Sequence, residues 1–260
     1  MQPSFPIKSQ PEPENKFPDC LYMKLEGIPV NPDSQDSLRF WQILSQRQQI
    51  NLHLTINFNE QWESLQEGHI KFGLKGGELR LTLENSEVPY ESRELSGAFE
   101  LSIPIEREEP KGSSDQKGQE SATPTVNSSL NGSQTKSHSP VSTEQKLGRT
   151  EQDQVSICHI TTKVTEENPT WIFEEEVGET VLKGSLKTVK LATLHVLALP
   201  CRVEATFEVS KRDVCLTEAE GLWSADLSRN KRAVLDRLII QRLLEPKFQP
   251  YLSRAELRYD

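Results

Sequence analysis

The residues of this chain that could do acid–base chemistry are three consecutive carboxylates, Glu174, Glu175 and Glu176, which follow Trp171 closely. Glycoside hydrolysis uses two carboxyl groups placed on either side of the scissile bond, and an aromatic ring beside them could stack on a sugar. A run of acids is more often a solvated strand edge or loop. A sugar-active enzyme with a carboxylate site is therefore kept as an alternative, and no catalytic residue is assigned.

The histidines and cysteines form no pattern typical of a metal site or a catalytic nucleophile. Cys158 and His159 are adjacent, and neighbouring residues of a strand point to opposite faces, so the two side chains are badly placed to share a ligand. Cys201 and Cys215 are expected to be packed thiols. No phosphate-binding glycine loop and no Gly-x-Ser-x-Gly or His-Glu-x-x-His pattern occurs. We expect no bound metal and no cofactor, and a protein that is not an enzyme.

The best candidate for a binding site is the basic C-terminal part of the chain. Residues 224–260 carry eight cations and five anions, although the whole chain has a net charge of −9. Arg229, Lys231 and Arg232 stand where we expect a helix to begin, and cations at that end oppose the helix dipole. Because they bring the helix no benefit there, we predict that they contact a partner, either an acidic protein or a phosphate group. The alternative is a helix that covers an open sheet face with its charges in water.

The helix itself is predicted by the spacing of its apolar residues. Apolar side chains recur at positions 234, 235, 238, 239, 243 and 244, with Ser228 as a suitable N-cap and Pro246 as a stop. This pattern predicts a helix over residues 229–245. The last residues, 250–260, are expected to form a turn and a short helical or docking segment.

Most of the remaining chain alternates apolar and polar residues, which is typical of half-buried strands. The clearest case is "QINLHLTINF", residues 49–58, and further strands are predicted around 69–74, 78–84 and 97–106 and through 155–210. Lys75-Gly76-Gly77 is expected to be a hairpin turn between two of them. A short helix behind Asp36, over residues 36–48, is the exception.

Two segments are too polar to bury a core. Residues 1–19 are rich in proline and charge, and residues 107–150 contain few sizeable apolar side chains, so neither can offset the entropy lost on ordering. We expect a disordered tail and a disordered linker or insertion. The chain also lacks a secretory signal pattern and any apolar run of about 18 residues, so it is expected to be soluble and cytoplasmic, with no membrane span.

The two β segments on either side of this insertion resemble each other. With a shift of 108 positions, residues 74–102 and 182–210 share eight identities in 29 positions without a gap, and Trp62 and Trp171 align after a one-residue slip. We interpret this as a duplication, with coincidence between two similar binary patterns as the alternative. The two tryptophans are expected to be core aromatics of the same framework.

These observations predict a mainly β protein. We expect an antiparallel β-sandwich-like body built from two similar β units, 20–106 and 151–223, interrupted by the insertion and followed by a C-terminal helical segment, 224–260. Two separate β domains on a tether are the alternative. The predicted function is that of a non-catalytic intracellular adaptor or accessory subunit that binds another protein through the terminal helix or a sheet edge. A nucleic-acid-binding accessory protein that uses the basic helix is the second possibility, and the overall negative charge counts against it.

Overall fold

The computed structural model describes residues 11–30, 48–103, 155–163, 168–176, 180–223 and 227–260. Residues up to 104 and from 154 onward belong to one compact unit, and it is this unit that is described below. Most of the short helix expected at 36–48 and the whole expected insertion at 107–150 lie outside the described residues.

The unit is mainly β, with every strand pair antiparallel, as the sequence predicts. Its larger sheet has eleven strands. In spatial order these are β1 (Glu14–Asn15), β14 (Ser253–Tyr259), β12 (Cys201–Glu208), β6 (Gly76–Glu84), β10 (Thr170–Glu175), β9 (Val155–Lys163), β8 (Gly97–Ser102), β11 (Gly184–Val196), β3 (Gln49–Phe58) and β2 (Leu21–Pro29), with β7 (Ser86–Glu87) beside β11. A single 3₁₀ turn, Tyr90–Ser92, precedes β8.

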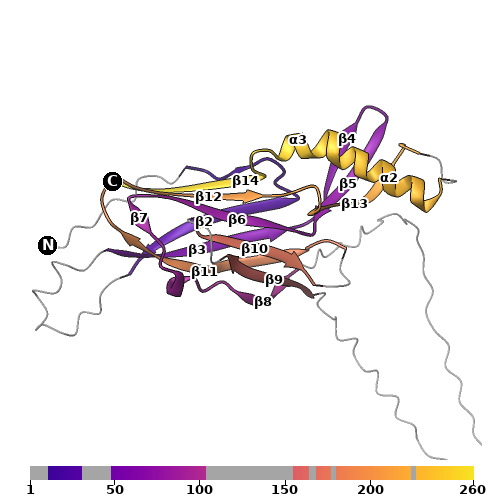
Figure 1. Cartoon of the computed structure of the whole chain (residues 1–260). Helices are drawn as coiled ribbons and strands as arrows, with labels where there is room; N and C mark the ends of the chain where they lie inside the picture. Colours follow the sequence, from indigo (N-terminus) through magenta and orange to yellow (C-terminus); the bar gives the residue numbers. More distant parts are fainter. Residues whose placement is uncertain (1–10, 31–47, 104–154, 164–167, 177–179, 224–226) are drawn as a thin grey trace, which may run out of the picture. The chain divides into compact units, whose positions relative to one another are not determined.

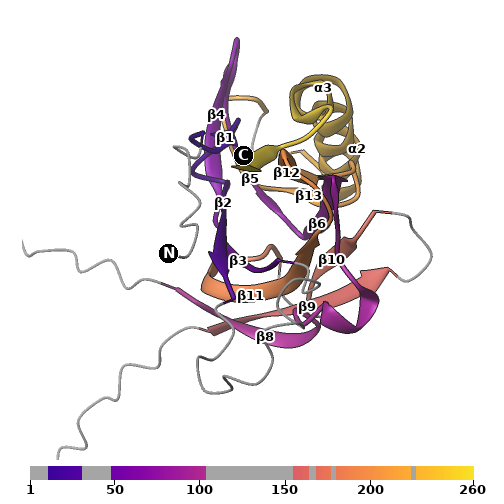
Figure 2. The same ribbon diagram turned by 90° about the vertical axis from the view of Figure 1, so that its left-hand side faces the viewer.

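The large sheet curls until β14, which lies beside the short end strand β1, approaches β2 at the other end, which gives a nearly closed barrel-like body (Figure 2). Asn15 bridges the two ends: its Oδ1 accepts a hydrogen bond from the backbone N–H of Met23 at 3.0 Å and from the Ser253 hydroxyl at 2.5 Å. Nearby, the Tyr259 ring of β14 lies against Gly27 of β2, where a Cβ would come within 1.8 Å of its hydroxyl. Curling of this kind leaves a sheet with less free edge.

The interior of this body is filled by the apolar residues of the alternating strands. In β3, Ile50, Leu52, Leu54, Ile56 and Phe58 are all buried, while the residues between them are partly exposed. Three rings from distant strands, Phe58, Phe173 and Phe207, meet with their centroids 5.6–6.0 Å apart. The period-2 pattern read from the sequence therefore corresponds to one aromatic-centred core.

A smaller sheet of three strands completes the unit. It consists of β13 (Val214–Glu220), β5 (Gly68–Leu74) and β4 (Gln61–Leu65), in that order. The terminal helices lie beside it (Figure 1). Phe72 of β5 packs with Phe17 and Phe248, the three ring centroids being 5.4–5.7 Å apart, so a second aromatic cluster joins the N-terminal segment, the small sheet and the last helix.

Strands from the two halves of the chain alternate within the large sheet. β6 lies between β12 and β10, and β11 pairs with β3, so each half completes the other. The β segments expected at 20–106 and 151–223 thus contribute to one body. The alternative of two separate β domains on a tether does not describe this sheet.

Lys75-Gly76-Gly77 is not a hairpin turn, which corrects the sequence interpretation. β5 ends at Leu74 in the small sheet and β6 begins at Gly76 in the large sheet, so the chain crosses here between sheets. The glycines are needed for close approach: a Cβ on Gly76 would lie 2.2 Å from the Phe173 carbonyl oxygen, and one on Gly77 would lie 2.4 Å from the Phe207 ring. Crowding by two neighbouring strands explains both residues.

Both chain ends contribute strands to the described structure. Residues 14–15 of the expected tail form β1, and Phe17 is buried, so order begins before residue 20. The last segment, expected to be a turn and a short helix, is instead the strand β14, whose residues alternate between buried and exposed. Ala255, Leu257 and Tyr259 alternate with charged residues, so the strand pattern is present in the sequence.

The strands that the 108-residue shift aligns have different neighbours. β6 lies between β12 and β10, whereas β11 lies between β8 and β3. Trp171 is fully buried and Trp62 is 43% exposed, so the two tryptophans do not share an environment. The topology adds no support for a duplication, which stays a prediction.

Candidate functional site

The terminal helix has three parts. α2 (Arg229–Ile239) is followed by a π-helical stretch, η2 (Ile240–Leu244), and by the short α3 (Glu245–Phe248). Ser228 has the extended backbone of an N-cap, but its side chain makes no capping hydrogen bond within the described structure. Pro246 does not stop the helix: it stands in the first turn of α3, directly after the π-helical stretch.

The π-helical stretch determines which side chains of the helix are buried. Ile240, Leu244 and Phe248 point into the protein at a spacing of four residues. Of the apolar residues in the predicted stripe, Val234, Leu238 and Leu243 face outward and are 60%, 39% and 41% exposed. We call these three residues the outer apolar face.

The three cations predicted to bind a partner are all exposed in the first turn of α2. Arg229 and Lys231 reach into solvent, and the guanidinium of Arg232 lies 6.0 Å from the centroid of the Trp223 ring. The backbone N–H of Arg232 donates to the Ser228 carbonyl at 3.0 Å. The structure thus places the predicted site residues together on one accessible turn, next to Val234.

Farther along, α2 forms one wall of a cleft with β13, with a volume of about 760 Å³. Lys75, Lys211, Arg212 and Arg237 contribute cationic side chains to its lining. Among the described residues that line it, Asp236 carries the single carboxyl group. Burial raises the pKa of that carboxyl above its ordinary value, against the opposing charge of Arg232.

The half-buried thiol of Cys215 also lines this cleft. Burial raises its pKa, with Lys75 opposing the shift. At neutral pH it is a thiol, whereas nucleophilic attack requires a thiolate. Cys215 is therefore a packing residue of the cleft wall, as expected.

Within the described residues, the parts of the carboxylate site that the enzyme alternative would use lie apart. Trp171 lies fully in the core and cannot stack on a sugar. Glu174 and Glu176 are exposed on and after β10, and Glu175 lies 3.9 Å from the ammonium of Lys75. The described cleft offers one carboxyl group where acid–base hydrolysis uses two.

Cysteine and histidine are likewise dispersed. Cys158 is buried and its neighbour His159 is exposed on the opposite face of β9. Burial raises the pKa of Cys158 and of Cys20 to about 12. Within the described residues, no group of three or more potential ligands could hold a metal ion.

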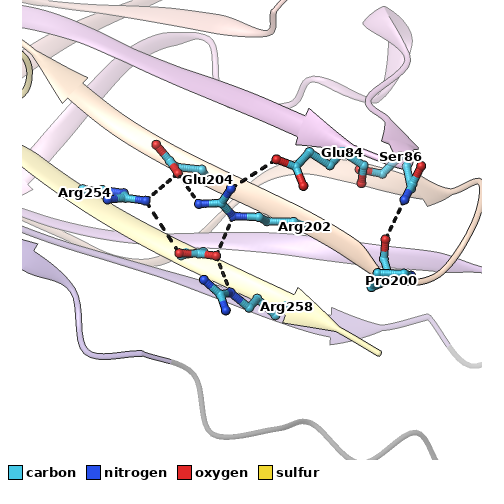
Figure 3. A network of polar contacts seen from close by, with 9 residues as sticks. Glu84, Ser86, Pro200, Arg202, Glu204, Arg254 and Arg258 are labelled. Atoms are coloured by element: carbon cyan, nitrogen blue, oxygen red, sulfur yellow. Dashed lines mark hydrogen bonds and ion pairs between the residues drawn. The ribbon is translucent and has the colours of Figure 1, made fainter.

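A dense network of charged side chains lies on the outer surface of β6, β12 and β14 (Figure 3). Arg202 of β12 is at its centre: its guanidinium donates to Glu256 at 2.6 Å, to Glu204 at 2.8 Å and to Glu84 at 3.1 Å. Arg254 also donates to Glu204, at 2.8 Å. The network joins three adjacent strands, so its charges are satisfied by each other, which is typical of a framework role.

Glu256 is the most enclosed carboxylate of this network, with its side chain 10% exposed. It accepts hydrogen bonds from Arg258 and Arg202, and Arg254 lies 3.8 Å away. The hydrogen bond from Arg258, together with the one from Arg202, holds the pKa of Glu256 below its ordinary value although burial acts in the other direction. Arg254 and Arg258, counted as part of the basic terminus, therefore belong to the sheet surface.

Comparison with known proteins adds no identity: no family model, no curated protein and no solved structure matches this chain. Within the described residues, none of the helices has the length and apolar character that crossing a membrane would require.

Sequence reasoning missed the cleft and the outer apolar face. Lys75, the pair Lys211-Arg212 and Arg237 are far apart in sequence, and only the sheet crossing and the helix bring them together. The outward position of Leu243 follows from the π-helical stretch, which shifts residues relative to a regular 3.6-residue period. Val234 and Leu238, which are offset from the buried Ile240, Leu244 and Phe248, were the available signal.

Proposed function

We propose that this protein is a non-catalytic accessory or adaptor protein that binds another protein through the outward surface of its terminal helix. The observation that carries the proposal is the outer apolar face, where Val234, Leu238 and Leu243 are exposed on a helix whose other apolar side is buried. Large apolar side chains that are exposed among charged ones are candidates for an interaction site.

The charges around this face support an acidic partner. Arg229, Lys231 and Arg232 lie at one end, and Arg242 follows on the exposed side of the π-helical stretch. In a chain with a net charge of −9, such a local excess of cations would steer a negatively charged surface toward the helix. The apolar residues would then provide the buried centre of the contact, with the cations at its rim.

A nucleic-acid partner is the second candidate, since the same cations could contact phosphates. Phosphate contacts alone do not use exposed aliphatic side chains such as Val234 and Leu238, and the surrounding protein is acidic. The outer apolar face therefore favours a protein. We also propose a cytoplasmic setting, which is supported by the cysteines: all four lie in described segments and all are free thiols.

Affinity capture from native lysate with matched variants tests the proposal. We expect the wild-type chain to retain a protein in stoichiometric amount and Val234→Asp to lose it. Leu197→Asp is the control, because Leu197 is also an exposed apolar residue, 50% accessible, beyond the end of β11. Retention by both variants, or loss from both, would contradict binding through the helix.

Nuclease treatment and a salt series distinguish a nucleic-acid partner from a protein partner. If the retained material were held through nucleic acid, nuclease would release it and the affinity would fall steeply as salt is raised. We expect retention to survive nuclease and to depend on Val234.

A further inference from the structure

The cleft between α2 and β13 lies beside a free strand edge. β13 pairs with β5 on one side, and it is the end strand of the small sheet. On its other side, no backbone hydrogen bond to another segment occurs within the described residues. The edge therefore presents N–H and C=O groups to whatever occupies the cleft.

Three consecutive residues of β13, Val214, Cys215 and Leu216, line the cleft. Successive side chains of a strand point to opposite faces of the sheet, so a cavity that lay over one face would contact alternate residues only. Contact with three in a row fits a cavity that reaches the strand edge. The register of β13 with β5 is regular over these residues and shifts only between Leu216 and Glu218, so this stretch keeps the geometry of an ordinary strand.

Four cationic side chains surround this edge. Lys211 and Arg212 come from the turn before β13, Lys75 from the sheet crossing and Arg237 from α2. Asp236 is the acidic residue of the described lining, and its Oδ1 is buried without a hydrogen-bond partner among the described residues. The cleft thus combines a positive rim, an apolar floor that includes Val214 and Ile240, and an acceptor that can take a hydrogen bond from an N–H group.

We propose that this cleft binds an extended acidic segment of a partner protein, which adds a strand to β13. The backbone of the segment pairs with the β13 edge, its carboxylates meet Lys75, Lys211, Arg212 and Arg237, and its apolar residues cover the floor. Strand addition takes its affinity from main-chain hydrogen bonds and its specificity from alternate side chains, and the cleft offers both. The inference rests on the proposed function, because it names the chemistry of the partner, but it uses a different surface from the outer apolar face.

Strand pairing is tested by N-methylation of a peptide probe. The probe is fluorescein-labelled Glu-Val-Glu-Val-Glu-Val-Glu, and its binding to the full chain is followed by fluorescence anisotropy. Two further versions carry N-methyl groups on alternate residues, one set along each edge of the peptide strand. We expect one methylated version to bind at least about tenfold more weakly and the other to bind nearly as well as the parent, because only one edge pairs with β13. The two versions are matched in charge and in methyl number.

Single substitutions test whether the peptide binds in the cleft between α2 and β13. We expect Arg237→Gln and Lys211→Gln each to weaken the peptide by about three- to tenfold, and Arg242→Gln, on the same helix outside the cleft, to change the affinity less than about twofold. Val234→Asp should leave peptide binding intact, since Val234 belongs to the outer apolar face. All four positions are exposed, so the fold is not at risk.

The proposal is overturned by any of three results. These are no binding of the parent peptide, equal loss for the two methylated versions, or a labelled deoxythymidine decamer that binds more tightly than the peptide with the same dependence on Arg237 and Lys211. If Val234→Asp abolishes partner capture while the peptide does not bind, the strand-addition site is wrong and the helix site stands.

Discussion

At the scale of single residues, the ion pairs on the sheet surface contribute to the stability of the fold. Glu256 is nearly enclosed and accepts hydrogen bonds from Arg202 and Arg258. Its pKa in the folded protein is lowered, so it stabilises the fold fully above its ordinary value of 4.5, and this contribution is lost as pH falls through the lowered value. We expect Glu256→Gln to reduce the free energy of unfolding by about 1–3 kcal/mol at pH 7, with the deficit shrinking below pH 4.5.

The measurement is urea denaturation of both proteins across pH. Glu26→Gln serves as the control, because Glu26 makes a surface pair with Lys24 and its side chain is 36% exposed. Exposed pairs of this kind contribute little, so the control should differ from wild type by less than about 1 kcal/mol. A pH-independent deficit for Glu256→Gln would show that its carboxylate charge does not matter.

Gly77 tests the corrected interpretation of the Lys75-Gly76-Gly77 segment. A Cβ there would meet the Phe207 ring at 2.4 Å and the Glu208 carbonyl oxygen at 2.9 Å. We expect Gly77→Ala to lower the free energy of unfolding by about 1–3 kcal/mol through overpacking, measured by urea denaturation. In a solvent-facing turn, where a methyl group would have room, the substitution would leave stability unchanged, and that outcome would contradict the sheet crossing.

At the scale of elements, the terminal helix has side chains that divide clearly into a buried set and an exposed set. Leu244 is fully buried and its neighbour Leu243 is 41% exposed. We expect Leu244→Ala to destabilise the protein by about 2–5 kcal/mol and Leu243→Ala by less than about 0.5 kcal/mol in urea denaturation. Equal effects would mean that the π-helical stretch does not set the orientation of the helix.

The sequence predicted this helix from its start at Arg229, but it could not predict which apolar residues are buried. Val234 and Leu238 follow helical spacing as well as Ile240 and Leu244 do, and periodicity alone does not say which set meets the protein. The answer depends on Phe17 and Phe72, which pack against Phe248 and come from distant parts of the chain. Arg229, Lys231 and Arg232 are exposed, which fits both the predicted partner contact and the alternative of charges in water, and their role stays a proposal.

At the scale of the whole molecule, interleaving of the two chain halves is the defining property. β6 is held between β12 and β10, so neither half forms the large sheet alone. We expect the chain, cut at a protease site introduced between residues 104 and 154, to elute as one species from a sizing column without denaturant. Separation of the halves under those conditions would contradict the shared sheet.

The positions of many strands could be predicted from the sequence because these strands have one buried face, as in β3 and β12, where alternate residues are buried. The pairing of these strands could not be predicted, because alternation shows which side chains share a face and does not identify the partner strand. The same limit explains the missed cleft: Lys75 and Arg237 meet only through a sheet crossing and a helix docked from the far end of the chain.

Hydrogen exchange of the purified chain, with and without the captured partner, tests the central claim most directly. The account predicts that partner binding slows exchange of backbone amides in residues 229–239. It predicts little change in β3 and β11, which lie on the side of the body away from α2 (Figure 1). Protection confined to other segments, with α2 unchanged, would contradict binding through the terminal helix.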